Sequence, residues 1–159
     1  MKTDFIKKCM LLSVVWLACL GDLGLKAEAR EVTSFNAGWE FKKGPFAADA
    51  MKAAAQWNAG WQQVAVPHTW NAEDMQQKTN SFYAGVAYYR KRHVFPQSLE
   101  GKRIFLRFEG VGACAEVYVN GYLVGTHKGA YSAFVCEIGA QVKYGEENEI
   151  VVKADNAAR

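Results

Sequence analysis

Histidine and cysteine are both scarce in this sequence, which holds three histidines and four cysteines among its 159 residues. His68, His93 and His127 stand alone, with neither a CxxC nor an HxxxH pattern around them. Protein zinc sites usually draw their ligands from such closely spaced pairs. The sequence therefore predicts no metal site, and none of its motifs indicates a cofactor.

An excess of charge of one sign is missing as well. The chain carries 19 Lys and Arg against 16 Asp and Glu, a formal net charge of +3 at pH 7. Proteins that bind nucleic acid usually present a clear basic surface, so this balance argues against such a partner. The run Arg90-Lys91-Arg92-His93 is basic, but on a strand its side chains alternate between two faces. We expect a solvated face with one inward, ion-paired arginine.

No apolar run is long enough to span a membrane as a helix, which takes about 20 residues. Cys9 to Leu20 is apolar apart from Ser13, follows three lysines, and precedes the small-x-small sequence Ala27-Glu28-Ala29. This pattern is typical of a secretory signal peptide and predicts that residues 1–29 are removed on export to the periplasm or the exterior. Leu17-Ala18-Cys19 also resembles a lipoprotein cleavage box, which would leave a lipid anchor on Cys19.

Removal of residues 1–29 leaves two cysteines, Cys114 and Cys136. They lie on separate predicted strands, and their spacing does not show whether they are close enough to bridge. We expect two small buried apolar residues.

The remaining residues, 30–159, read as short strands separated by turns. Asn120-Gly121 between alternating apolar residues predicts a hairpin with a type I′ turn. The predicted strands are residues 39–43, 61–66, 86–95, 103–109, 114–119, 122–126, 133–138 and 149–154. Eight such strands predict a single all-β sandwich domain. The expected core includes Phe105, Val117, Val119, Phe134 and Val151.

Three motifs follow one another along the chain. The first is Pro67-His68-x-Trp70, and the second is Tyr89-Arg90-Lys91. The third begins with Val119-Asn120-Gly121 and continues through Gly125, His127, Gly129, Tyr131 and Phe134, the last two of which we expect to cap the core. In this order they resemble the N-terminal sugar-binding domain of glycoside hydrolase family 2, the family of β-galactosidases, β-glucuronidases and β-mannosidases. The resemblance covers residues 36–156 and implies a jelly-roll β-sandwich of the galactose-binding-domain type.

The resemblance implies a domain of an exported β-galactosidase-like enzyme that binds a terminal β-linked sugar. Such enzymes hydrolyse glycosides with two glutamates about 5–5.5 Å apart, which in this family lie on a separate barrel downstream. No carboxylate here matches them, and Glu73-Asp74 and Glu146-Glu147 read as solvated turn charges. We therefore expect a C-terminally truncated piece of a longer chain, inactive without its catalytic domains. A free-standing carbohydrate-binding module is the alternative.

Some members of the family use an asparagine of this domain to hydrogen-bond the terminal sugar. The matching segment implies Asn80 and Tyr83 as substrate-binding residues, with Asp155 as a third candidate. The family asparagine stands in an Asn-Pro-Thr-Gly context, whereas this chain reads Asn80-Ser81-Phe82-Tyr83. The alternative is that Asn80 only caps a turn. No residue of this chain is implied to be catalytic.

Overall fold

The computed structural model describes residues 30–44, 57–71 and 82–157. The predicted signal peptide and Asn80 lie outside these residues. The described strands all lie in the compact unit Ser34–Arg159. They are β1 (Trp39–Lys43), β2 (Gln62–Val64), β3 (Val86–Val94), β4 (Phe105–Phe108), β5 (Cys114–Val119), β6 (Tyr122–Lys128), β7 (Phe134–Glu137) and β8 (Glu147–Asp155). Two short 3₁₀ turns, η2 (Gln97–Leu99) and η3 (Gly139–Gln141), connect them. Within the described residues, no helix is long and apolar enough to cross a membrane.

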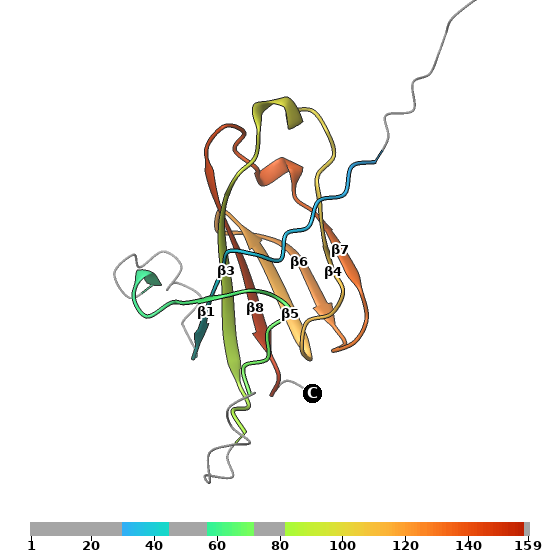
Figure 1. Cartoon of the computed structure of the whole chain (residues 1–159). Coiled ribbons are helices and arrows are strands. Elements are labelled where there is room, and N and C mark those ends of the chain that lie inside the picture. Colours follow the sequence, from blue (N-terminus) through green and yellow to red (C-terminus); the bar gives the residue numbers. More distant parts are fainter. Residues whose placement is uncertain (1–29, 45–56, 72–81, 158–159) are drawn as a thin grey trace, which may run out of the picture. The chain divides into compact units, whose positions relative to one another are not determined.

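The strands form two sheets, as the sequence predicts. Six strands pair in the order β2-β1-β3-β8-β5-β6, and β4 pairs with β7 in a second sheet. Every pairing between named strands is antiparallel. Figure 1 shows β4 and β7 lying beside the larger sheet rather than continuing it. The all-β jelly-roll sandwich is confirmed.

The main core lies between the two sheets. It contains Val117 and Val119 from β5, Ile150 and Val152 from β8, and further residues from β4 and β7. We call the face of the larger sheet that carries these side chains the inner face, and the opposite one the outer face. Val151 is also buried, but it packs in a second cluster with Trp57 and Tyr88, on the outer face by the alternation of a strand.

Two expectations about the core are wrong. Phe105 is 40% exposed, because it shares a face of β4 with Arg107 while Leu106 points into the core. The Arg103 guanidinium lies 4.8 Å from the Phe105 ring centroid and covers part of that surface. Tyr131 is 97% exposed and does not cap the sandwich. Phe134 does pack against the core, half-buried.

The predicted hairpin between β5 and β6 is confirmed. Asn120 and Gly121 both have positive φ, 51° and 82°, as a type I′ turn requires. The Asn120 side chain also reaches beyond the turn, since its Nδ2 donates to Gln141 O and to Asn148 Oδ1, both at 2.8 Å. Asn148 is fully buried; its Oδ1 accepts from the Lys143 N–H, and its Nδ2 donates to the Lys143 carbonyl. The turn is thereby tied to the start of β8.

The two cysteines are free thiols in this fold. Cys136 on β7 is buried in the main core, as expected, whereas Cys114 on β5 is only half-buried. Burial raises the pKa of the Cys136 thiol and so keeps it protonated.

Candidate functional site

A segment of the chain wraps around the β1 edge of the larger sheet and touches both of its faces. We call residues 57–71 the edge strap; it is the green segment that begins at the left of Figure 1 and then crosses the view toward β5. Its middle forms β2, which pairs with β1 from Trp39 to Phe41. Its first part packs on the outer face, where the rings of Trp57 and Tyr88 meet edge-on at 5.6 Å. Its last part packs on the inner face beside Tyr89.

The inner part of the strap carries the Pro67-His68-x-Trp70 motif. His68 Nδ1 lies 3.0 Å from the Tyr89 hydroxyl, and the His68 ring meets Phe41 edge-on at 4.6 Å. The Trp70 ring stacks beside Phe41 at 6.0 Å and meets Tyr83 edge-on at 6.4 Å. These contacts give a continuous row of rings from β3 across β1 to the segment before β3.

The protonation states of this row follow from its burial. Desolvation, with a smaller contribution from Lys43, lowers the pKa of His68. Desolvation raises the pKa of Tyr89 to about 12. Both groups are therefore neutral at pH 7, and the Tyr89 hydroxyl can donate to an unprotonated Nδ1 of His68. This is the hydrogen-bonded structural histidine that an isolated His predicts.

A recess of about 600 Å³ opens between the strap and the end of β1. Aromatic rings and polar side chains line it together, a combination found in many small-molecule sites. Its lining residues are Phe41, Lys42, Lys43, Gly60, Gln62, Pro67, His68, Thr69 and Trp70. The half-buried Trp70 ring can contact the apolar face of a sugar, while the amide, hydroxyl and ammonium groups can bond its hydroxyls.

The structure brings Tyr83 and Asp155 to the same end of the larger sheet. Tyr83 precedes β3, its hydroxyl donates to Val86 O at 2.7 Å, and Val86 pairs directly with Asp155. The Asp155 carboxylate accepts from the Ala157 N–H at 2.9 Å. The Lys43 ammonium lies 5.4 Å from the centroid of the Tyr83 ring, so Tyr83 also adjoins the recess. Asn80, the other predicted substrate-binding residue, lies outside the described residues.

Asn156 joins these two segments, and the sequence reasoning missed it. Its Oδ1 accepts from Gly85 N at 2.7 Å, and its Nδ2 donates to Tyr83 O at 3.1 Å. Asn71 Nδ2 donates to the same Tyr83 oxygen at 3.3 Å. The strap, the segment before β3 and the end of β8 are therefore held together at this end. The family resemblance extends to residue 156, but only the pairing of β3 with β8 shows which groups Asn156 bonds.

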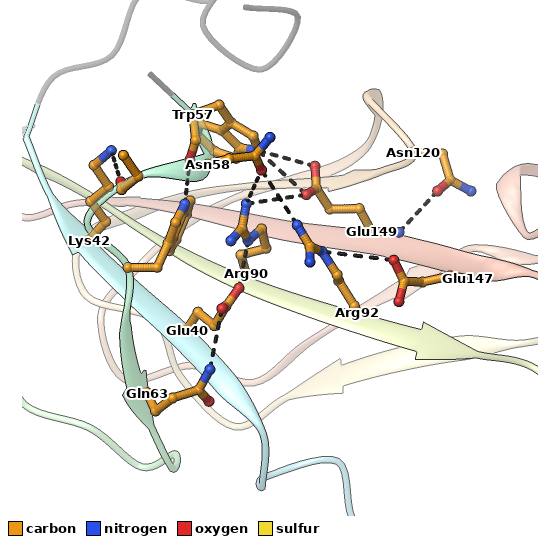
Figure 2. Close-up of polar contacts among 12 residues, drawn as sticks. Glu40, Lys42, Trp57, Asn58, Gln63, Arg90, Arg92, Asn120, Glu147 and Glu149 are labelled. Atoms are coloured by element: carbon orange, nitrogen blue, oxygen red, sulfur yellow. Dashed lines mark hydrogen bonds and ion pairs between the residues drawn. The ribbon is translucent and has the colours of Figure 1, made fainter. Parts of the chain in front are cut away.

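On the outer face, the strap is held by a polar network centred on Arg90, drawn in Figure 2. Arg90 is 2% exposed, and its Nε donates to Glu40 Oε2 at 2.7 Å. Its Nη1 donates to Asn58 Oδ1 at 3.0 Å and lies 3.7 Å from Glu149 Oε2. Its guanidinium stacks 4.2 Å from the Trp61 ring centroid. Arg90 is therefore the buried, ion-paired arginine that the strand pattern predicts, but it lies on the outer face beneath the strap and does not point into the main core.

The carboxylates in the network are held by arginine and tryptophan side chains. Glu40 and Glu149 both contact the Arg90 guanidinium, and the Trp57 indole N–H lies 3.3 Å from Glu149 Oε1. Glu147, one of the predicted turn charges, is largely exposed and lies 3.9 Å from Arg92. Glu73-Asp74 falls outside the described residues. Within the described residues, no three His, Cys, Asp or Glu side chains are grouped closely enough to hold a metal.

Comparison with known proteins identifies the same family that the motifs resemble. A family model described as "Glycosyl hydrolases family 2, sugar binding domain" matches residues 32–156. A β-glucuronidase of Bacteroides fragilis is 34% identical over 145 residues, which cover 91% of this chain and 19% of that protein. A β-galactosidase of Thermoanaerobacter pseudethanolicus is 34% identical over 80% of this chain and 17% of its own length. The chain thus spans about a fifth of these relatives.

Solved structures agree with the fold. A Bacteroides fragilis protein described as a "putative beta-galactosidase" is 69% identical and superposes with a TM-score of 0.73, over 83% of this chain and 20% of its own length. The β-glucuronidase of Bacteroides uniformis is 33% identical, with a TM-score of 0.70 over 80% of this chain and 15% of its own.

Proposed function

This chain belongs to the sugar-binding domain family of the family 2 glycosyl hydrolases, and we propose that it serves as that domain in an exported β-glycosidase. Hydrolysis of terminal β-galactosides or β-glucuronides is the proposed activity of the whole enzyme. The names of the relatives support both sugars, and the 69% identical protein favours the galactoside. The second candidate, a free-standing carbohydrate-binding module, predicts that no sandwich or barrel domain follows residue 159 in the reading frame.

The recess supports this proposal most directly. Trp70 offers partly exposed ring surface beside the buried Phe41, and Gln62, Thr69 and Lys43 offer hydrogen-bonding groups in the same hollow. We infer that a terminal sugar approaches this end of the sheet, where the segment carrying Tyr83 and the end of β8 also lie. In the whole enzyme, these residues would complete a subsite for a sugar whose glycosidic bond is broken on another domain.

Sugar binding by the chain tests the proposal. Titration with galactose and with glucuronate, followed by tryptophan fluorescence and by NMR chemical shifts, should reveal weak saturable binding of at least one sugar. Trp70→Leu removes a lining ring and should weaken this binding about tenfold, since stacking and burial of one aromatic contribute more than 1 kcal/mol. Tyr131→Ser, which removes an exposed aromatic outside the recess, is the matched control and should bind as the parent does. Equal loss in both variants would refute the recess as the site.

Export is a separate proposal, supported by the lysines and the apolar run of the first 29 residues. Mass spectrometry of the extracted cellular protein should find a new N-terminus at Arg30, or at a lipid-bearing Cys19. An intact Met1 would contradict both.

A further inference from the structure

Arg90 bonds to three separate parts of the fold through one guanidinium. Glu40 lies on β1, Glu149 lies on β8, and Asn58 with Trp61 lies on the strap. A fully charged group can remain buried here because two carboxylates offset its charge and its N–H groups find acceptors. Figure 2 shows the side chain lying between these partners.

The other contacts of the outer strap converge on the same partners. The Trp57 indole N–H reaches Glu149, and Gln63 Nε2 donates to Glu40 Oε1 at 3.2 Å. The Trp61 indole N–H donates to the Trp57 carbonyl within the strap. Removing Arg90 would therefore take away the stacking partner of Trp61 and also leave two carboxylates without the charge that orients them.

The position of Trp61 matters for the recess because its neighbours in sequence, Gly60 and Gln62, both line it. The facing wall is the end of β1, where Phe41 directly follows Glu40. Arg90 thus contacts one residue next to each wall, since it bonds Glu40 and stacks on Trp61, while Arg90 itself is not among the lining residues.

We propose that Arg90 is a positioning residue for the recess, holding the strap wall at a set distance from the β1 wall without touching the ligand. The effect on sugar binding rests on the proposed function; the effect on the strap does not. Arginine is required at this position because a planar guanidinium can stack on Trp61 while it bonds Asn58 and Glu40, whereas an ammonium is a compact point charge without a face to stack.

Arg90→Lys tests this because it keeps the positive charge between the two carboxylates and removes the planar group. Trp61→Leu removes the ring on which Arg90 stacks but keeps the ion pairs of Arg90 with Glu40 and Glu149. It is the second test variant if Arg90→Lys folds poorly. Arg103→Lys is the matched control: it is the same change at an arginine whose side chain is 73% exposed, and its partners Glu137 and Phe105 lie on the smaller sheet. Hydrogen exchange of peptides from the strap and from β8, melting temperature, and sugar affinity are measured on the full chain.

Arg90→Lys and Trp61→Leu should each speed exchange across residues 57–71 about tenfold while β8 changes by less than about twofold, as expected for local opening. Sugar affinity should fall about tenfold in both variants, and Arg103→Lys should leave strap exchange and sugar affinity unchanged. Exchange that rises equally in strap and sheet would overturn the proposal, because Arg90 would then only stabilise the fold. A loosened strap with unchanged affinity would overturn it too. If the parent chain binds no sugar, the proposed function fails, and strap exchange alone decides whether Arg90 positions the strap.

Discussion

Replacing Asn120 with glycine separates the two roles of this residue, turn formation and side-chain bonding. Glycine adopts the φ of 51° without strain, so the hairpin backbone is preserved. The side chain is lost, and with it the Nδ2 bonds to Gln141 O and Asn148 Oδ1 and the Oδ1 bond from Glu149 N at 3.1 Å. The variant therefore isolates the tie between the β5–β6 turn and the start of β8.

The loss of these three hydrogen bonds sets the size of the effect. Each contributes about 1 kcal/mol net, which gives about 3 kcal/mol in total. The buried Asn148 Oδ1 keeps a second donor, Lys143 N at 2.7 Å, so it is not left without a partner. We therefore expect the free energy of unfolding to fall by about 2–4 kcal/mol. For a domain of this size, that corresponds to a melting temperature lowered by about 8–16 °C.

Urea unfolding of the chain, followed by tryptophan fluorescence, measures this loss at an unchanged m-value. Gly121→Ala is the control within the same turn. Its φ is 82° and its added Cβ would meet no atom within 4 Å, so it introduces only left-handed strain of about 1 kcal/mol. An Asn120→Gly variant that loses less than about 1 kcal/mol would refute the reasoning, since the side chain would then contribute no more than the turn geometry.

The remaining predictions concern pH, substrate and catalysis. Burial raises the pKa of Tyr89 to about 12, so its contribution to stability is complete below pH 10. The free energy of unfolding should fall by up to about 1.4 kcal/mol per pH unit between pH 10 and 12. Tyr89→Phe should reduce this fall, which pH-dependent urea unfolding measures. If Asn80 bonds the sugar, Asn80→Ala should lower the kcat/KM of the whole enzyme at least about tenfold, or about 1.4 kcal/mol, with little change in melting temperature. A loss under about threefold would show that Asn80 only caps a turn. The chain by itself should not hydrolyse nitrophenyl β-galactoside above the buffer rate, and turnover abolished by mutating one of its own carboxylates would contradict the placement of catalysis on another domain.

Local patterns in the sequence determined most of the secondary structure. Alternation of apolar and polar residues depends only on the two-residue period of a strand, and the structure places eight strands close to the predicted ranges. Asn120-Gly121 specified its turn because few residue pairs tolerate two positive φ values in succession. The burial and ion pairing of one arginine on β3 could also be predicted, since a buried charge needs a partner.

Tertiary structure decided what those strands face. Phe105 is apolar, but the parity of β4 places it with Arg107, and only the docking of β4 and β7 on the larger sheet shows which face is the core. Asn156 and Tyr83 are 73 residues apart and meet only because β3 pairs with β8. Arg90 needed a partner by its sequence pattern, but its partners come from β1, β8 and the strap. Contacts of this kind depend on which strands become neighbours, and no local pattern carries that information.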